Sequence, residues 1–543
     1  MIILCYCQMV WSVNCRLIVA QLTLALILVY MYNISKLAQL DRLRQRSSEF
    51  DHLPHPVHPR RGIDEDGGRL QRQRSPALPQ ELSRSQHAGQ SDVVRCPNAR
   101  KPNATLDADW RRQDHLSGTM YIYTAVYDGR SDKGASDSVT VRLLVLASGL
   151  EDRDMDIYCQ IWYTDVSEPA VVRAGLIELD ADVRRRSLIH AQYVISCQLE
   201  QSTISVSGVS VVVGDRCGSS STLVPIQRPA AATETPDVGI CAVLAWPLSG
   251  DSTRKRAVRL SPWLVEWMEL QLTVFSASRV FLYVAFDDDL RPLKQLVRLY
   301  TDRKSLVVRR IPHPVEGRKR QRQETIGNLR ALAVNDCLLR NAPQFRYLIH
   351  IDVDELIVPR HVAVNYSDMI ARIHSVVNKR PPKPHGALSS TPIVYFFHMV
   401  SFFLDVPTDE PNSSPRLTTT GYFRSRDKLE KGARRAMIDA TRCVVVSPST
   451  GCDVTVMADS TTSLKDSHVS VPLNVAGCHR YRRACAPDVH VGCKTAPHNV
   501  TPIKDNTMLR FQPRLKFPVI QALKDSGTVD KAGLYQVAIN ADA

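Results

Sequence analysis

A short acidic cluster set between two apolar runs is the feature that most constrains how this chain can fold. Residues 347–351 are apolar and rich in β-formers, Asp352, Asp354 and Glu355 follow, and a second apolar run comes next. Such runs predict a buried strand. Because side chains alternate along a strand, Asp352 and Asp354 are expected on one face. Glu355 is expected on the opposite face, paired with an arginine.

Two carboxylates on one face at the end of a strand predict a hard oxygen site suited to Mn²⁺ or Mg²⁺. Such an ion can hold a diphosphate and neutralise the charge that it gains as a leaving group, which is the chemistry of a nucleotide-sugar transferase. Asp-x-Asp is a short motif, and the chain repeats it elsewhere in polar surroundings, where a solvated turn is the simpler interpretation. Only Asp352 and Asp354 lie between apolar, β-branched runs.

The length and composition predict several globular domains. The chain has 543 residues, of which 44% are hydrophobic and 23% are charged. Its formal net charge of +14 raises the alternative of a nucleic-acid-binding protein. No nucleic-acid motif accompanies the charge, so we expect no nucleic-acid partner.

The N-terminal region predicts a membrane anchor followed by a stem. Residues 1–35 are read as a cytoplasmic tail and an uncleaved signal-anchor helix, since no small-x-small cleavage site follows the apolar run at 17–32. The basic residues after this run oppose the positive-inside rule for that orientation. Residues 36–119 contain few large apolar side chains and are expected to be a disordered stem.

Cysteines and glycosylation sequons place the rest of the chain in an oxidising lumen. Eleven cysteines follow the anchor, and acceptor sequons begin at Asn103, Asn365, Asn412 and Asn499. Disulfides are favoured over a zinc site because the chain has no Cys-x₂-Cys pair. An odd number leaves one thiol free or paired between chains.

Two kinds of pattern follow the stem. Residues 120–237 contain short β-type runs separated by Gly, Asp and Ser turns, and predict a small β-rich module that ends in a linker. Residues 238–515 alternate strand and helix patterns, which predicts an α/β domain with a mostly parallel sheet and helices on both faces. Residues 516–543 are expected to be a C-terminal tail.

The segment from about Val238 to Leu515 resembles glycosyltransferase family 92, whose galactosyltransferase members are Golgi type II membrane proteins. Upstream, Tyr123 to Arg130 and Cys159 to Tyr163 resemble the module that precedes this domain. Two departures concern donor choice and acceptor fit: no glycine-glutamine pair precedes Asn335, and His-Arg-Tyr-Arg replaces a His-Tyr-Arg run. The matching motifs are Cys241 to Pro247, Trp267 to Glu269, Arg279 to Tyr283, Asn335 to Leu338, Ile351 to Pro359 and His479 to Arg482.

The resemblance implies a GT-A-like mixed sheet, Mn²⁺ or Mg²⁺ as cofactor, and a UDP-sugar donor, with UDP-galactose expected. It implies that Asp354 binds the metal directly and that Asp352 holds the ribose or a water on the metal. His479 is a candidate third metal ligand, with a structural role as its alternative. The acceptor is expected to be a glycan or glycoprotein in the Golgi.

The remaining candidate residues are less tightly specified. Asp287 and Asp289 end an earlier strand and are candidates for contacts to uracil or ribose, with a polar turn as the alternative. Asn335 and Asp336 are candidates for donor contacts, against packing or capping roles. Arginines 480, 482 and 483 could clamp the diphosphate.

An inverting transfer needs a carboxylate base to deprotonate the acceptor hydroxyl. Asp405, Asp409 and Glu410 follow an apolar run and are the candidates, although no motif supports them. Two alternatives to a galactosyltransferase remain open. The first keeps the fold and uses another UDP-sugar, and the second is a membrane-anchored glycan-binding protein with little or no turnover.

Overall fold

The structure is a computed structural model, and several stretches of the chain lie outside its description. Among the described residues, no helix is long and apolar enough to cross a membrane. The predicted anchor at 1–35 and most of the predicted stem lie outside the described residues. Those described are 94–102, 109–115, 118–130, 139–148, 150, 155–179, 190–199, 205–229, 237–244, 263–284, 290, 293–312, 314, 319–378, 393–403, 423–440, 443, 445–447, 451–453, 468–482, 502–504 and 507–526.

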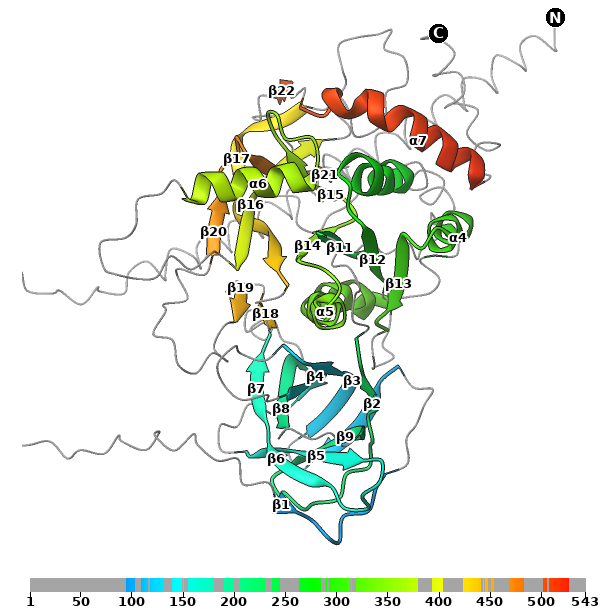
Figure 1. Cartoon of the computed structure of the whole chain (residues 1–543), viewed down its shortest axis with the longest axis vertical. Coiled ribbons are helices and arrows are strands. Elements are labelled where there is room, and N and C mark those ends of the chain that lie inside the picture. The colour runs from blue at the N-terminus through cyan, green and yellow to red at the C-terminus, as the bar shows by residue number, and fades with distance from the viewer. Residues whose placement is uncertain are drawn as a thin grey trace, which may run out of the picture. The chain divides into compact units, whose positions relative to one another are not determined.

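Residues 94–227 form two β-sheets, which we call the β-rich module (Figure 1). The predicted β-rich character of residues 120–237 is confirmed, with β3, β4, β5, β8 and β9 as the longest strands. The first sheet has the order β10-β3-β4-β8-β7, with β2 beside β3, and the second has the order β1-β6-β5-β9. The strands are β1 (Val94–Arg95), β2 (Arg111–His115), β3 (Gly118–Asp128), β4 (Val139–Ala147), β5 (Ile157–Tyr163), β6 (Ala170–Arg173), β7 (Gly175–Glu178), β8 (Ala191–Leu199), β9 (Val206–Val213) and β10 (Ile226–Gln227).

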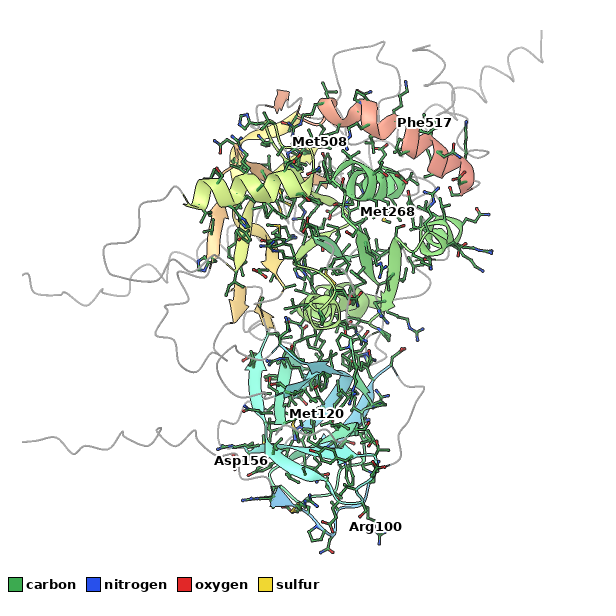
Figure 2. The ribbon with its side chains drawn as sticks, in the orientation of Figure 1. Arg100, Met120, Asp156, Met268, Met508 and Phe517 are labelled. Atoms are coloured by element: carbon green, nitrogen blue, oxygen red, sulfur yellow. A yellow bond between two sulfur atoms is a disulfide. The ribbon has the colours of Figure 1, made fainter. Side chains whose placement is uncertain are left out.

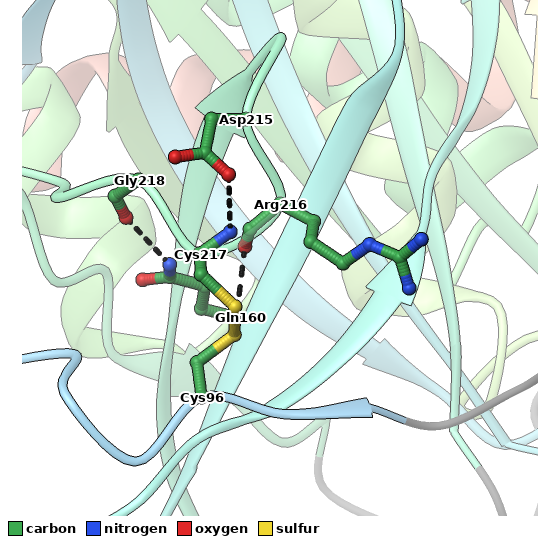
Figure 3. Close-up of a disulfide and its surroundings, with 6 residues drawn as sticks. All are labelled: Cys96, Gln160, Asp215, Arg216, Cys217 and Gly218. Carbon is green, nitrogen blue, oxygen red and sulfur yellow. Dashed lines mark hydrogen bonds between the residues drawn. A yellow bond between two sulfur atoms is a disulfide. The ribbon is translucent and has the colours of Figure 1, made fainter.

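The two sheets of the module enclose their own core and are stapled by disulfides. Inward side chains of β3, β4, β5 and β9 pack together, and Cys159–Cys197 joins β5 to β8. A second disulfide, Cys96–Cys217, ties the start of the module to the loop after β9 (Figure 3). The predicted preference for disulfides over a zinc site is confirmed for these four cysteines.

A mixed sheet of ten strands forms the centre of the second half, and we call it the central sheet. Its order is β13-β12-β11-β14-β17-β16-β21-β15, with β20 beside β16 and β22 beside β17. From β13 to β14 neighbouring strands are parallel, whereas β17 is antiparallel to β14. The strands are β11 (Val238–Val243), β12 (Arg279–Val284), β13 (Leu306–Arg310), β14 (Tyr347–Asp352), β15 (Glu355–Pro359), β16 (Val394–Phe403), β17 (Phe423–Asp439), β20 (His468–Val471), β21 (Ala476–Arg482) and β22 (Pro502–Lys504). A separate pair is formed by β18 (Val445–Ser447) and β19 (Gly451–Asp453).

Helices cover both faces of the central sheet, and the predicted α/β architecture is confirmed in this respect. A helix at 263–269 continues as η2 (Leu270–Val274) and packs with α4 (Lys294–Asp302), α6 (Tyr366–Asn378) and α7 (Gln512–Asp525) in one core. In the part of the chain that the structure describes, one helix, α5 (Lys319–Asn341), covers the other face, and a disulfide joins its Cys337 to Cys241 of β11.

The described core extends beyond the predicted end of the domain at residue 515. Helix α7 follows the short 3₁₀ helix η6 (Leu509–Phe511), and its Val519, Ala522 and Leu523 are buried in the same core as η2. The apolar spacing of these residues is that of a helix with one buried face. In Figure 2 the labelled Met268 and Met508 belong to the same core, whereas Phe517 of α7 is 73% exposed.

The β-rich module and the central sheet are joined by a shared core. Strand β4 is buried on both faces, because one face packs inside the module and the other faces α5. This explains its near-continuous apolar sequence, which lacks the alternation of a half-exposed strand. Residues 85–543 accordingly form one compact unit.

Candidate metal and donor site

The acidic cluster lies in a turn, not along one strand as predicted. Strand β14 ends at Asp352, Val353 and Asp354 form the turn, and β15 begins at Glu355. The two strands lie apart in the sheet order, because β15 pairs with β21 at the far end. We call residues 352–355 the acidic turn.

The turn brings the three carboxylates together. Their ligand atoms lie within 4.8 Å of one another, and all three residues are buried. The expectation that Glu355 faces away from the aspartates is wrong, since the backbone N–H of Asp352 donates to Glu355 Oε2 at 2.9 Å. The alternation argument fails because the strand does not continue through residues 353 and 354.

The backbone of the acidic turn is held by three donors. Trp263 Nε1 donates to the carbonyl of Val353 at 3.1 Å, and Trp267 Nε1 donates to the carbonyl of Glu355 at 2.7 Å. The amide of Tyr481 in β21 donates to the carbonyl of Asp354 at 2.8 Å. Because these groups are buried, they fix the carbonyls in place and leave the carboxylates to face other partners.

Three arginines face the three carboxylates. Arg435 of β17 donates to both carboxylate oxygens of Glu355, with Nη2 2.5 Å from Oε1. Arg330 of α5 places Nη1 2.5 Å from Asp352 Oδ2, which Arg435 Nη2 also approaches at 3.3 Å. Arg480 is the loosest partner, since its Nε lies 3.5 Å from Asp354 Oδ2. The predicted arginine partner of Glu355 is therefore present, although on a different face from the one expected.

Burial and neighbouring charges shift the pKa values of the three carboxyl groups in different directions. Burial raises the pKa of Asp354 to about 7, and the neighbouring Glu355 and Asp352 carboxylates add to the rise. Burial also raises the pKa of Asp352, against the opposing effect of Arg330. For Glu355, burial acts in the same sense, but the charge and hydrogen bonds of Arg435 outweigh it and lower the pKa.

The oxygens of the two aspartates fit a divalent cation. Asp352 Oδ1 is buried and has no hydrogen-bond partner among the described residues. A buried acceptor without a partner is costly, and a hard cation such as Mn²⁺ or Mg²⁺ would satisfy it. Among the described residues, Asp354 has only the distant Arg480 as a cationic partner, whereas both oxygens of Glu355 accept from Arg435. Asp352 Oδ1 and the Asp354 carboxylate are thus the available ligand atoms.

The structure does not bring His479 to the acidic turn. In the pairing of β15 with β21, Glu355 lies opposite Arg480, and Leu356 lies opposite His479. Directly paired residues share a face of the sheet, so Arg480 takes the side of Glu355. The ring of His479 is fully buried and stacks on Phe402 at 4.3 Å, a contact typical of a structural histidine.

Asn335 and Asp336 are buried in α5 and make packing contacts. Asn335 Nδ2 donates to the carbonyl of Ala331 at 2.8 Å. Asp336 accepts from the hydroxyl of Tyr283 at 2.8 Å and from Arg340 Nε at 2.6 Å. The neighbouring Cys337 forms the disulfide to Cys241 of β11.

Six of the predicted site residues lie outside the described residues. These are the donor candidates Asp287 and Asp289, the diphosphate candidate Arg483 and the base candidates Asp405, Asp409 and Glu410. Their roles stay predictions.

Comparison with known protein families adds one match. Residues 260–512 match glycosyltransferase family 92, and this span contains the acidic turn, both tryptophans and all three arginines. The chain contains a glycosyltransferase family 92 domain. No curated protein matches the chain. The match begins after β11, so this inner strand of the central sheet lies upstream of it.

Several residues that build the site in the family 92 domain were not predicted from the sequence. They are two arginines, Arg330 and Arg435, and two tryptophans, Trp263 and Trp267. Arg330 lies on α5, which precedes β14 in the chain. Arg435 lies in β17, which was not predicted because its sequence is largely polar. Trp263 and Trp267 lie on the helix before η2, and their indole N–H groups donate to backbone carbonyls of the acidic turn.

Proposed function

We propose that this chain is a metal-dependent inverting glycosyltransferase that moves a sugar from a UDP-sugar onto a glycan acceptor, with UDP-galactose as the expected donor. The observation that carries the proposal is the acidic turn of the family 92 domain, where Asp352 Oδ1 and Asp354 present available oxygens at a buried position. A domain of this family together with a cation-binding acidic pair favours nucleotide-sugar transfer over a binding role.

The residues of the acidic turn and the arginines that contact them would have different roles. Asp354 and Asp352 Oδ1 would hold the cation, which supplies positive charge to offset the charge of a departing diphosphate. Arg330 and Arg435 orient Asp352 and Glu355 and balance their charge. A carboxylate with one oxygen fixed by arginine keeps the other in a defined direction, which is the arrangement that a metal ligand needs.

Arg480 is the residue best placed to contact the donor diphosphate. Its side chain is 34% exposed, compared with 16% for that of Arg435, and its contact with Asp354 is long. A guanidinium binds diphosphate oxygens in pairs through its planar fork of donors. In this proposal Arg480 exchanges its weak contact with Asp354 for the diphosphate when donor and metal are bound.

The acceptor hydroxyl needs a base, and Asp405, Asp409 and Glu410 remain the candidates that we propose for it. Asp287 and Asp289 remain the proposed contacts to uracil or ribose. We also propose that residues 1–35 anchor the protein in the Golgi membrane with the family 92 domain in the lumen. The three described disulfides support an oxidising compartment for residues 96–337.

The decisive experiment measures UDP release by the full chain, purified in detergent from a secretory host, with a panel of UDP-sugars and a mixed glycan acceptor pool. The expected result is turnover of UDP-galactose that needs Mn²⁺, stops in EDTA and is lost in Asp354→Ala. Asp302→Ala is the matched control, because this carboxylate is 69% exposed on α4 and makes only an exposed ion pair. Folded protein that turns over no donor, with or without acceptor, would favour a glycan-binding protein instead.

A further inference from the structure

Helix α5 lies between the β-rich module and the central sheet and shares one core with both. Its polar partners on the module side are Gln192 and Thr124, and on the side of the central sheet they are Asp352 and Tyr283. The apolar residues of this shared core include Leu144 and Val194 of the module, Leu332 and Leu338 of α5, and Phe281 and Leu348 of the central sheet.

Gln192 of β8 reaches from the module into the backbone of α5. Its side chain is buried, with 3% exposure, and Oε1 accepts the backbone N–H of Leu332 at 3.0 Å. An amide in the middle of a helix ordinarily donates to the carbonyl four residues earlier, so Gln192 supplies an acceptor from outside the helix. This contact fixes one turn of α5 to the module.

The same turn of α5 carries the arginine that holds the acidic turn. Arg330 precedes Leu332 by two residues, and its Nη1 lies 2.5 Å from Asp352 Oδ2. The module therefore reaches Asp352 through two contacts and one turn of helix. Further along α5, Arg340 Nη2 donates to Thr124 Oγ1 of the module at 2.9 Å, so the helix is joined to the module at two points.

We propose that Gln192 is a positioning residue for the metal site, acting through the Leu332 amide and Arg330 on Asp352. The β-rich module then helps to position the metal site of the family 92 domain, although the module lies outside the matched span. Partners one step beyond the ligands set ligand direction, and Gln192 extends that support across the module boundary. The inference rests on the proposed function only in taking Asp352 and Asp354 as metal ligands.

The test compares two buried glutamines of the module in the full chain. Gln192→Met removes the acceptor and keeps the length and burial of the side chain. Gln160→Met is the matched control, because Gln160 is 1% exposed and its Nε2 donates to the Gly218 carbonyl inside the module, beside the Cys96–Cys217 disulfide (Figure 3). Hydrogen–deuterium exchange of peptides that cover residues 347–360 reports on the acidic turn, and calorimetry with Mn²⁺ reports on the site.

We expect Gln192→Met to speed exchange at the acidic turn and to weaken Mn²⁺ binding, each by about fivefold, as the loss of one hydrogen bond predicts. Gln160→Met should leave both at the parental values even if it lowers the melting temperature. Thr124→Val, which is close to isosteric, tests the second contact should Gln192→Met fail to fold. It should speed exchange at residues 347–360 by about twofold.

Parental exchange at 347–360 in both Gln192→Met and Thr124→Val would overturn the inference, as would equal changes in Gln192→Met and Gln160→Met. The proposed function fails separately, if the parent protein binds no Mn²⁺. In that case the exchange comparison alone still decides whether the module positions the acidic turn.

Discussion

Glu355 and Arg435 form a bidentate ion pair in which Nη2 and Oε1 are 2.5 Å apart and the Glu355 side chain is fully buried. Glu355 opens β15, whereas Arg435 lies in β17, which pairs with β14. The ion pair thus joins β15, which follows the acidic turn, to β17, which is the neighbour of β14. The geometry of the turn depends on this contact between distant segments.

Arg435→Met should destabilise the protein by about 3–5 kcal/mol, because it leaves a buried carboxylate without its partner. The double variant Glu355→Leu/Arg435→Met should recover much of this loss, since no uncompensated charge remains. Thermal unfolding of the metal-free proteins measures both. Arg298→Met is the control, because its ion pair with Asp302 is 80% and 69% exposed. A shift no larger than that of the control would contradict the role given to this pair.

The stability of the metal-free protein should fall as the pH rises from about 4 to about 7 because of Asp354. Its pKa is raised to about 7 in the folded protein from 3.8, so the folded state holds this proton more tightly than the unfolded chain does. The stabilisation is complete below the unfolded pKa and is lost as the pH passes the folded one. Asp354→Asn should lack this component.

The measurement is the difference in melting temperature between parent and Asp354→Asn at pH 5 to 8, which cancels groups common to both. Asp302→Asn serves as the exposed control. A difference that does not vary with pH would show that Asp354 titrates in the same range folded and unfolded.

Mn²⁺ binding should weaken as the pH falls below about 7, since the ion competes with the proton on Asp354. One displaced proton predicts about a tenfold rise in Kd for each pH unit. Titration calorimetry at pH 5.5, 6.5 and 7.5 gives the slope, and buffers of different ionisation enthalpy count the protons released. A constant Kd would remove Asp354 from the ligand set.

Arg130→Met should destabilise the contact between the β-rich module and the central sheet by about 3 kcal/mol. Arg130 pairs with the buried Asp128 and donates from Nη1 to the carbonyls of Ala440 and Cys443 at 2.7 and 2.6 Å. Arg173→Met removes an Arg–Asp pair of the same module that is 75% and 43% exposed, and should cost less than about 1 kcal/mol. Similar melting temperatures for the two variants would argue against a structural role for Arg130 at this contact.

The sequence predicted the strand that carries the acidic cluster but not where that strand ends. Residues 347–352 are buried and apolar enough to be read as a strand from their own pattern. The turn at 353 and 354 depends on Trp263, Tyr481 and Arg435, which are distant in sequence, so the local pattern does not contain it. The placement of Glu355 beside the aspartates could not be predicted for the same reason.

Strand β17 was not predicted from the sequence, because its own residues do not show a strand pattern. Most of its 17 residues are charged or polar, and its longest apolar run is the three residues before Asp439. The strand is specified by β14 and β16 on its two sides, because burial against neighbours decides strand formation more than intrinsic preference. Arg435 was missed with it.

Strand β11 lies between β12 and β14 and pairs in parallel with both, yet it precedes residue 260, where the family match begins. A fragment cut to the match would leave β12 and β14 each with a row of unpaired backbone N–H and C=O groups along an apolar strand. Open edges of that kind recruit other chains, so such a fragment would self-associate. The start of the family match at residue 260 is therefore not a position at which the protein can be cut, because a stable fragment must also include β11.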